Sequence, residues 1–314
     1  MNKFFPFIIL LFLFQNTQSQ NFVDLANASY AISPNNYWSL DGDASLSVAS
    51  LNAKLPIKRE NGDLAIFGLN GSTFKISSSN NDFEYPLIYS STLLFGYTKK
   101  LNSKSQLLLM ALPKISSDLE DVSKNDFQLG GIALFTFTKS EKFKYKFGLY
   151  YNQEYWGSFL VPIIGFDWQP NDKLQAFGNL PINATLMYKL NNKFSAGLFF
   201  QAPAGSFRMN ENFTVPENSI MDTENIKFPN AYIHKTTQEI SLFLDYYITR
   251  NIVLNLKCGA TIGRSYRVFA EDDKLDFKIA AFNFGEERIQ LNKDFSDGLI
   301  FELNFIYRLH FADL

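Results

Sequence analysis

Apolar and polar residues alternate with a period of two along most of this chain, and this pattern constrains its fold more than any other feature. In the last segment, one parity is apolar throughout: Leu299, Phe301, Leu303, Phe305, Tyr307, Leu309 and Phe311. Most of the opposite parity is polar: Glu302, Asn304, Arg308 and His310. Successive side chains of a β-strand point to opposite faces, so the pattern predicts strands with one apolar face. No stretch has a helical apolar period with caps at both ends, so we expect almost no helix.

The alternation predicts fourteen strands, and their lengths favour a membrane barrel. They lie at 22–32, 44–57, 64–76, 87–99, 105–116, 127–138, 143–154, 159–169, 174–178, 182–190, 194–204, 236–248, 252–266 and 299–311. Most are long enough to cross a bilayer at a tilt of about 45°, whereas strands of soluble proteins average about five or six residues. The segments 174–178 and 182–190 are too short to span comfortably. The expected number of full-height antiparallel strands is therefore 12 or 14, and both even counts return the two ends of the barrel to the periplasm.

The predicted connections differ in length in a regular way. The short ones are 58–63, 100–104, 139–142, 170–173, 191–193 and 249–251. The longer ones are 33–43, 77–86, 117–126, 205–235 and 267–298, and only 155–158 and 179–181 break the rule. Short periplasmic turns that alternate with long extracellular loops are typical of outer-membrane barrels. A soluble β-sandwich is the alternative, but it has no reason to sort its loops by length.

The N-terminus predicts export. Lys3 is followed by an apolar run, Phe4–Phe14, and by a polar stretch that ends at Ser19. This order is typical of a cleaved signal peptide, and the run is too short to span a membrane as a helix. We therefore expect residues 1–19 to be a signal peptide and residues 20–314 to be the barrel. Such a protein would reside in the outer membrane of a Gram-negative bacterium, in contact with its lipid, after insertion by the barrel assembly machinery.

Composition excludes several other classes. The chain has 29 Lys and Arg against 31 Asp and Glu and no basic block, which argues against a nucleic-acid partner. A single cysteine, Cys258, excludes an internal disulfide and a thiolate-rich metal site. Cys258 lies on the apolar parity of its strand, so we expect it to behave as a small hydrophobic residue. An aromatic content of 16% at a mean hydropathy of −0.10 suggests apolar residues spread through alternating strands.

Several short runs resemble a family of uncharacterised Gram-negative outer-membrane β-barrels. These runs are Asp126–Gly131, Lys144–Tyr151, Asp297–Phe301 with Tyr307-Arg308, Leu55–Lys58, and Phe284-Gly285 with Arg288. The family is catalogued as domain of unknown function 6268, and the resemblance covers essentially the whole chain after the signal peptide. It implies the barrel architecture and supplies no activity and no catalytic residues.

No constellation of residues points to catalysis, a metal or a cofactor. The two histidines are His234, in a predicted loop, and His310, at the end of the last strand. A serine hydrolase would need a serine within hydrogen-bond reach of one of them. The acidic run Glu271–Asp273 with Asp276 does not have the spacing of a calcium loop. We therefore expect no enzyme, no metal and no cofactor.

Nine charged residues fall opposite the apolar face of their strands. They are Lys144, Lys146, Glu154, Asp167, Glu239, Asp245, Lys257, Glu302 and Arg308. A charge that faces lipid at mid-depth costs roughly 2–4 kcal/mol, so these side chains are predicted to face the lumen. They would either line a passage that selects a solute or pair with one another and brace the barrel. The signs are mixed, so no strong ion selectivity follows.

These observations lead to two hypotheses about function. The first is passive passage or uptake of small solutes through the lumen. The second is a plugged barrel that binds or scaffolds partners through loops 205–235 and 267–298. Both loops are rich in apolar residues: Phe207, Phe213, Ile220, Met221, Phe228, Tyr232, Phe269, Leu275, Phe277, Ile279, Phe282, Phe284 and Ile289. We therefore expect an ordered cap over the outer entrance, with 278–284 as a strand that extends above the membrane.

Overall fold

The computed structural model describes most of the chain after the predicted signal peptide. The described residues are 22–38, 42–78, 85–209, 213–214, 227–228, 230–285, 287–292 and 297–310. The signal peptide predicted at 1–19 lies outside them, as do residues 215–226 of the predicted cap. Within the described ranges, no helix is long and apolar enough to cross a membrane. The helical content of these ranges is one 3₁₀ turn, η1 (Lys124–Asp126).

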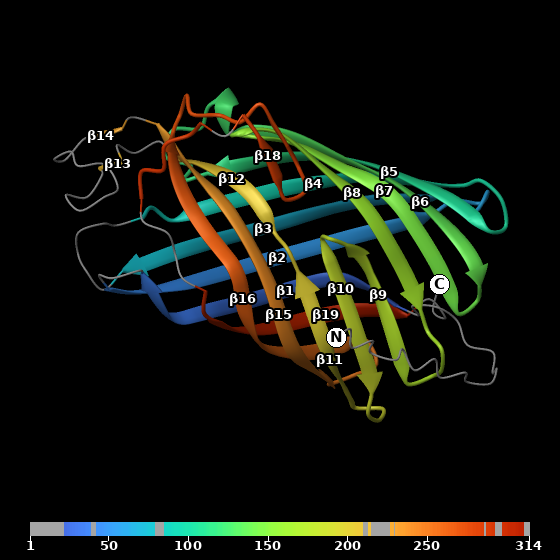
Figure 1. The fold of residues 1–314 in the computed structure, drawn as a ribbon. Helices are drawn as coiled ribbons and strands as arrows, with labels where there is room; N and C mark the ends of the chain where they lie inside the picture. Colours follow the sequence, from blue (N-terminus) through green and yellow to red (C-terminus); the bar gives the residue numbers. More distant parts are fainter. Residues whose placement is uncertain are drawn as a thin grey trace, which may run out of the picture.

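The strands close into a 14-stranded antiparallel barrel, shown in Figure 1. The first eight are β1 (Phe22–Trp38), β2 (Gly42–Lys58), β3 (Leu64–Ser78), β4 (Ile88–Lys100), β5 (Ser105–Ser117), β6 (Phe127–Ser140), β7 (Phe143–Glu154) and β8 (Gly157–Trp168). The others are β9 (Leu174–Leu180), β10 (Asn183–Lys189), β11 (Phe194–Gln201) with its continuation β12 (Ala204–Met209), β15 (Ala231–Tyr247), β16 (Ile252–Ala270) and β19 (Leu299–His310). β19 pairs with β1 and closes the ring. The short strands β9 and β10 are hydrogen-bonded members of it, so the number is 14 rather than 12.

The outward face of the barrel is apolar. Leu242 and Ile164 are 66% and 63% exposed, and the last strand exposes Leu299, Phe301, Leu303, Phe305 and Tyr307. Cys258 lies on this face and is exposed. Closure by β1 and β19 leaves the ring without an end strand, and side chains of this kind favour contact with lipid rather than water. The chain is thus an outer-membrane barrel of porin-like architecture.

Short turns join the strands at the periplasmic end. They are 59–63, 101–104, 141–142, 169–173, 190–193 and 248–251. In the first turn, Asp63 accepts hydrogen bonds from the Tyr97 hydroxyl at 2.5 Å and from the Lys100 N–H at 2.8 Å. The hydrogen bond from the Tyr97 hydroxyl, and to a smaller extent that from the Lys100 N–H, holds the pKa of the Asp63 carboxyl below its usual range. The carboxylate therefore fixes the turn to the neighbouring strand β4.

Several outer connections are shorter than predicted. The connection predicted at 33–43 shrinks to residues 39–41, because β1 and β2 keep pairing up to Trp38 and Gly42. The segment after Ser33, which contains Pro34 and Asn35, lies at a register shift rather than in a turn. The predicted loop 205–235 likewise loses residues to β12 and β15. His234, expected in that loop, lies on β15.

Candidate functional site: the barrel lumen

Three neighbouring strands change direction at one level of the barrel. β11 and β12 are separated by Ala202 and Pro203, and β15 shifts register between Thr236 and Gln238. In β16 the shift falls at Gly263, whose φ of 62° lies in the left-handed region. Since Ala204 pairs with Thr236, these irregularities lie next to one another across the sheet. Bulges bend a strand, so the residues beyond them can leave the direction of the wall.

The carboxylate of Asp297 holds this bend on the β16 side. It accepts the N–H of Gly263 and the N–H of Arg264, each at 2.9 Å, and the hydroxyl of Thr261 at 3.1 Å. Without this acceptor, the N–H groups at the register shift would lose their partner. We call the segment beyond the bend the inward sheet; it comprises β12, residues 231–236 of β15 and residues 265–270 of β16.

One face of the inward sheet packs against the lumen side of β2, β3 and β4. From the inward sheet, this apolar core contains Phe207, Met209, Ala231, Ile233, Tyr266 and Val268. From the facing strands it contains Leu46, Phe74, Ile76 and Ile88. The rings of Phe74 and Phe207 meet edge to face at 4.7 Å between centroids. Ile233 and Val268 are fully buried, so this layer leaves no room between the inward sheet and the wall.

The other face of the inward sheet packs against the lumen side of β7 and β8. Tyr232 and Phe269 alternate with residues of the first core, and they contact Trp156, Phe159 and Leu275. Trp156 and Tyr232 are fully buried. The outer half of the barrel is therefore filled by three layers of strands. In the described part of the chain, a sheet that turns into the barrel occupies the outer half of the lumen.

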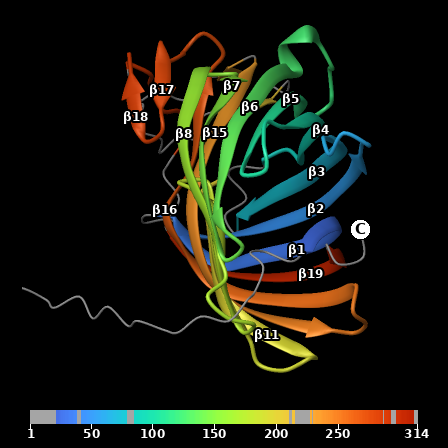
Figure 2. The ribbon, with the colours of Figure 1, turned by 90° about the vertical axis from the view of Figure 1, so that its right-hand side faces the viewer.

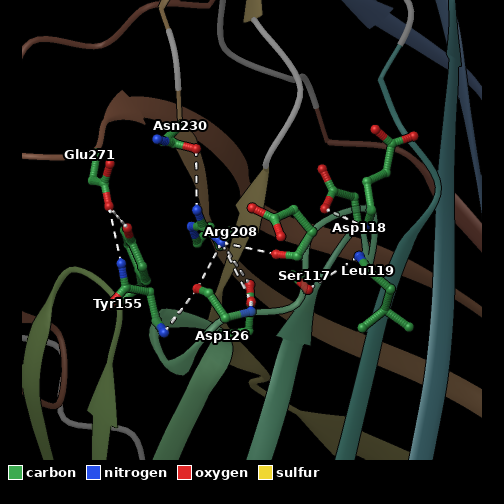
Figure 3. A network of polar contacts seen from close by, with 12 residues as sticks. Ser117, Asp118, Leu119, Asp126, Tyr155, Arg208, Asn230 and Glu271 are labelled. Carbon is green, nitrogen blue, oxygen red and sulfur yellow. Dashed lines mark hydrogen bonds and ion pairs between the residues drawn. The ribbon is translucent and has the colours of Figure 1, made fainter.

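Polar groups fix the inward sheet to the wall at its free edge. Glu154 of β7 accepts both the N–H and the hydroxyl of Ser206 at 2.7 Å, and it pairs with Lys114 at 3.2 Å. Arg208 donates to Asp126 at 3.4 Å and to Asn230 at 3.2 Å, as Figure 3 shows. Buried charges are costly unless they are paired and hydrogen-bonded, and these charges have such partners.

The periplasmic half of the lumen holds a polar cavity of about 430 Å³. Its charged lining comprises Asp24, Lys54, Lys146, Asp245, Lys257 and Arg308. Its amide and hydroxyl lining comprises Asn27, Asn179, Asn183, Thr185, Asn255 and Asn304. This volume lies within the range of about 300–1,000 Å³ that is typical of small-molecule sites.

A chain of hydrogen bonds runs along one wall of this cavity across four strands. Asn27 donates to Asn304 at 3.1 Å, Asn304 to Asn255 at 2.9 Å, and Asn255 to Asp245 at 2.6 Å. Arg308 then bridges Asp245 at 3.0 Å and Asp24 at 2.7 Å. These side chains come from β1, β19, β16 and β15, whose pairing brings them to one level. The chain holds them against the wall and leaves the space beside it open.

Apolar side chains also line the polar cavity and narrow the lumen at its periplasmic side. Phe22 of β1, Met187 of β10 and Phe243 of β15 form a buried cluster on the lumen side. Phe22 and Met187 also line a second cavity of about 680 Å³ at the periplasmic mouth. These two side chains therefore stand between the polar cavity and the periplasm.

The nine charged residues predicted from parity are distributed over both halves of the barrel. The periplasmic half contains the pairs Lys146–Asp167 at 2.6 Å, Lys257–Glu302 at 3.0 Å and Arg308–Asp245 at 3.0 Å. Lys144 lies beside Lys146 on the same face of β7, and Glu239 accepts a hydrogen bond from Gln201 at 2.5 Å. Glu154 lies in the outer half, at the inward sheet. A role of these nine residues in selecting a solute stays a prediction.

Sequence reasoning missed the uncharged and inward-sheet members of the lumen. The asparagines Asn27, Asn255 and Asn304 lie on the same parity as the predicted charges, and this signal would have found them. Arg208 and Ser206 had no such signal, because their segment was assigned to a loop. The histidines have structural contacts: His234 is buried against the ring of Trp156, and the Nε2 of His310 lies 3.0 Å from the carbonyl of Arg250.

Comparisons with known proteins give one family model and several similar solved structures. A family model described as "Domain of unknown function (DUF6268)" matches residues 16–299. A comparison with curated proteins gives no significant match. Among solved structures, the COG4313 outer membrane channel from Pseudomonas putida F1 is similar at 9% identity and a TM-score of 0.46, over 94% of this chain and 97% of that one.

Two further solved structures are similar at comparable levels. The NanC porin has 10% identity and a TM-score of 0.36, over 90% of this chain and 100% of that one. A deletion mutant of the TodX monoaromatic hydrocarbon channel has 9% identity and a TM-score of 0.35, over 94% and 91% of the two chains. No statement about activity follows from similarities at this level.

Proposed function

This chain belongs to the family described as domain of unknown function 6268, and on that premise we propose that it is a gated passage for small polar solutes across the outer membrane. The observation that carries the proposal is the polar cavity of about 430 Å³ in the periplasmic half. If the charged side chains served only as a brace, they would pack against one another across the lumen. Instead, Lys146, Lys257 and Arg308 each pair with a carboxylate on the same side of the wall, and the space between the walls is left for a solute.

The two ends of the cavity support a gated rather than an open passage. The inward sheet fills the outer half of the barrel, and the Phe22–Met187 contact region narrows the periplasmic side. For a solute to enter from outside, the inward sheet has to move. The strand irregularities at Gly263 and Pro203, where this sheet bends, are the points about which the sheet can pivot. We therefore expect a low resting conductance.

The lining suggests which solutes fit best. Amide groups and charges of both signs surround the cavity, so a solute with several hydroxyl or amide groups would find partners on more than one wall. The paired charges cancel locally, and we expect only weak selectivity between anions and cations. An uncharged sugar-like molecule is the simplest probe of such a site.

The second candidate is a plugged barrel that acts through its outer surface. The observation that favours it is the packing on both faces of the inward sheet, where Ile233, Val268, Trp156 and Tyr232 are fully buried. Two complete apolar interfaces would have to separate before this sheet moves. In a plugged barrel, the polar cavity would have no transport role.

Liposome swelling tests the passage against the plugged barrel. We expect wild-type barrels in vesicles to admit small sugars at a measurable rate, and a cavity-filling substitution, Thr185→Trp, to reduce that rate several-fold. The matched control is Tyr188→Trp on the same strand, whose side chain is 45% exposed on the lipid face. It should leave the rate unchanged.

Three outcomes decide between the two functions. A reduced rate in Thr185→Trp alone supports the passage through this cavity. Swelling that neither variant changes would place the route elsewhere and contradict the proposed cavity. No swelling by wild-type barrels that migrate as folded, heat-modifiable protein would support the plugged barrel instead.

A further inference from the structure

A short hairpin in the connection after β16 lies against the wall of the barrel. It consists of β17 (Phe277–Ile279) and β18 (Phe282–Phe284). β17 pairs in parallel with residues Ser158–Leu160 of β8, and Figure 2 shows the hairpin beside β8 at one end of the barrel. Two flanking hydrogen bonds continue this contact, from the Leu275 N–H to Trp156 and from the Ala280 N–H to Leu160, each at 2.8 Å. The sequence predicted only a strand extended above the membrane here.

The hairpin occupies a place where the barrel wall lacks a strand. β9 pairs with β8 only from Ile164 to Trp168, because β9 ends at Leu180. Above this level the next strand, β12, turns into the lumen with the inward sheet. Among the described strands, the outer half of β8 thus has no antiparallel neighbour on that side. In a membrane, the exposed N–H and C=O groups of such an edge would each cost several kcal/mol.

The hairpin and a proline together reduce the number of unpaired backbone groups at the edge of β8. β17 and its flanks supply hydrogen-bond partners between Trp156 and Leu160. The carbonyl of Leu160 points toward β17, so the nitrogen of Pro162, two residues on, points to the same edge. Proline has no N–H to leave unpaired there. From Ile164 onward, β9 takes over. Such an arrangement is expected of a wall that faces lipid.

The register places one face of the hairpin on the outside of the barrel. Phe277 is paired with Ser158 and Ile279 with Leu160, and these β8 residues share their parity with the exposed Ile164. Lys278 alternates with them and is buried, with its ammonium 5.7 Å from the centre of the Trp156 ring. The inner side of β17 therefore faces the core of the barrel, and its outer side continues the lipid face of β8.

Three phenylalanines are exposed on this hairpin. Phe277 and Phe284 are stacked at 4.4 Å between centroids and are 41% and 42% exposed. Phe282 is 71% exposed. At about 25 cal/mol per Å², leaving three such rings in water would be costly. Contact of these rings with lipid removes this cost, and no protein partner is needed to cover them.

The position of Phe277 along β8 corresponds to the outer edge of the membrane. Trp168, near the periplasmic end of β8, is 40% exposed on the same parity as Ser158. The ten residue steps from Ser158 to Trp168 rise by roughly 33 Å along the strand. At a tilt of about 40° this is a height of about 25 Å, which is that of the apolar band between two aromatic girdles.

We propose that the β17–β18 hairpin is a membrane-embedded part of the barrel wall, and that Phe277, Phe282 and Phe284 bind the lipid of the outer leaflet at its interface. The hairpin thus replaces the outer halves that β9 and β10 lack. The partner is a lipid surface, and the contact does not depend on whether the barrel conducts a solute.

Spin labelling tests this placement. In a Cys258→Ser background, Phe282→Cys carries a nitroxide, and the barrel is reconstituted into phospholipid vesicles. We expect the label to collide more often with oxygen than with a water-soluble nickel chelate, as a lipid-facing label at Phe147→Cys should. The aqueous reference is Val122→Cys in the outer connection between β5 and β6, where Val122 is 52% exposed.

A label at Phe282→Cys that behaves like the aqueous reference would overturn the proposal. A second label at Phe284→Cys guards against a local distortion, and it should give the lipid-like ratio as well. Heat-modifiable migration of each labelled protein confirms that the barrel has folded. The ratio of oxygen to nickel collisions reports only the depth of the label in the membrane. It would therefore be the same if the barrel conducted no solute.

Discussion

Polar groups of a few single residues complete most of the free edge of β12, where a barrel would otherwise need a full neighbouring strand. Ser206 donates its N–H to the Glu154 carboxylate, and its carbonyl accepts from Gln128 at 3.2 Å. The carbonyl of Arg208 accepts the N–H of Asp118 at 3.2 Å. Because these groups point away from β15, the edge is satisfied by these contacts and by a single parallel bridge between Arg208 and Ser117 of β5. The inward sheet therefore depends on a few polar residues to a degree that ordinary barrel strands do not.

At the residue scale, Glu154→Gln should weaken the outer half of the barrel. The substitution removes the negative charge that pairs with Lys114 and one of the oxygens that hold Ser206. Removal of one partner of a buried pair costs roughly 3 kcal/mol. The measurement is urea unfolding in lipid vesicles, followed by tryptophan fluorescence, to which the nearby and fully buried Trp156 contributes.

The matched control for this substitution is Glu141→Gln in an exposed periplasmic turn. It changes the same charge without touching a buried contact, so the free energy of unfolding should stay within about 0.5 kcal/mol of wild type. Equal losses in both variants would show that total charge, rather than the contact with Ser206 and Lys114, sets the effect.

At the scale of elements, the inward sheet owes its direction to irregularities that fall together in three strands. Pro203 ends the pairing of β11, and β15 and β16 shift register beside it. β-bulges increase twist and bend a strand away from its neighbours. Since all three strands bend at one level, the segment beyond moves as a unit into the lumen and buries both of its faces.

Gly263→Ala should destabilise this bend. A Cβ at this position would meet nothing within 4 Å, so the cost comes from its positive φ and not from a clash. A left-handed conformation costs a residue with a side chain about 1 kcal/mol. We expect a loss of that size in the free energy of unfolding, with an increase in sugar permeability if the passage is real.

Gly71→Ala on β3 provides the comparison. A Cβ there would also meet little, at 3.8 Å from the Leu51 carbonyl, and Gly71 is not among the positive-φ glycines. It should be neutral or slightly stabilising, because alanine loses less chain entropy on folding than glycine. If Gly263→Ala were equally harmless, the bend would not need a left-handed residue.

At the scale of the whole molecule, the barrel has two halves of different character around one continuous lipid face. The periplasmic half keeps a polar lumen, and the outer half is filled by three layers of strands. Apolar residues point outward at every second position of the strands in both halves. Lipid contact imposes this pattern on the outside, while the inside is free to differ.

Cys258 reports on this outward face. It lies among exposed apolar residues that include Leu242 and Leu256. We expect it to react with a lipid-soluble maleimide and not with a membrane-impermeant one in intact cells. The protein should also fractionate with the outer membrane. Labelling by both reagents would show that this strand faces water, and recovery from the soluble periplasm would contradict the location.

Some features of the inside were within reach of the sequence and were still missed. The run Phe159–Ile164 is apolar on both parities, which indicates that β8 meets an apolar surface on its lumen side as well. The adjacent pairs Tyr232-Ile233 and Val268-Phe269 carry the same signal for the inward sheet. Two adjacent apolar residues indicate that both faces of their strand are buried, but they do not identify the residues that pack against each face.

The sequence by itself determined the alternating strands and their apolar outward face, because contact with lipid on one side imposes a strict local period. Only the tertiary structure decided that β12 and its neighbours turn into the lumen and that the β17–β18 hairpin fills the wall. Those choices rest on contacts between residues far apart in the chain, such as Phe74 with Phe207 and Ser158 with Phe277. A local pattern carries no information about which distant surface will supply the partner.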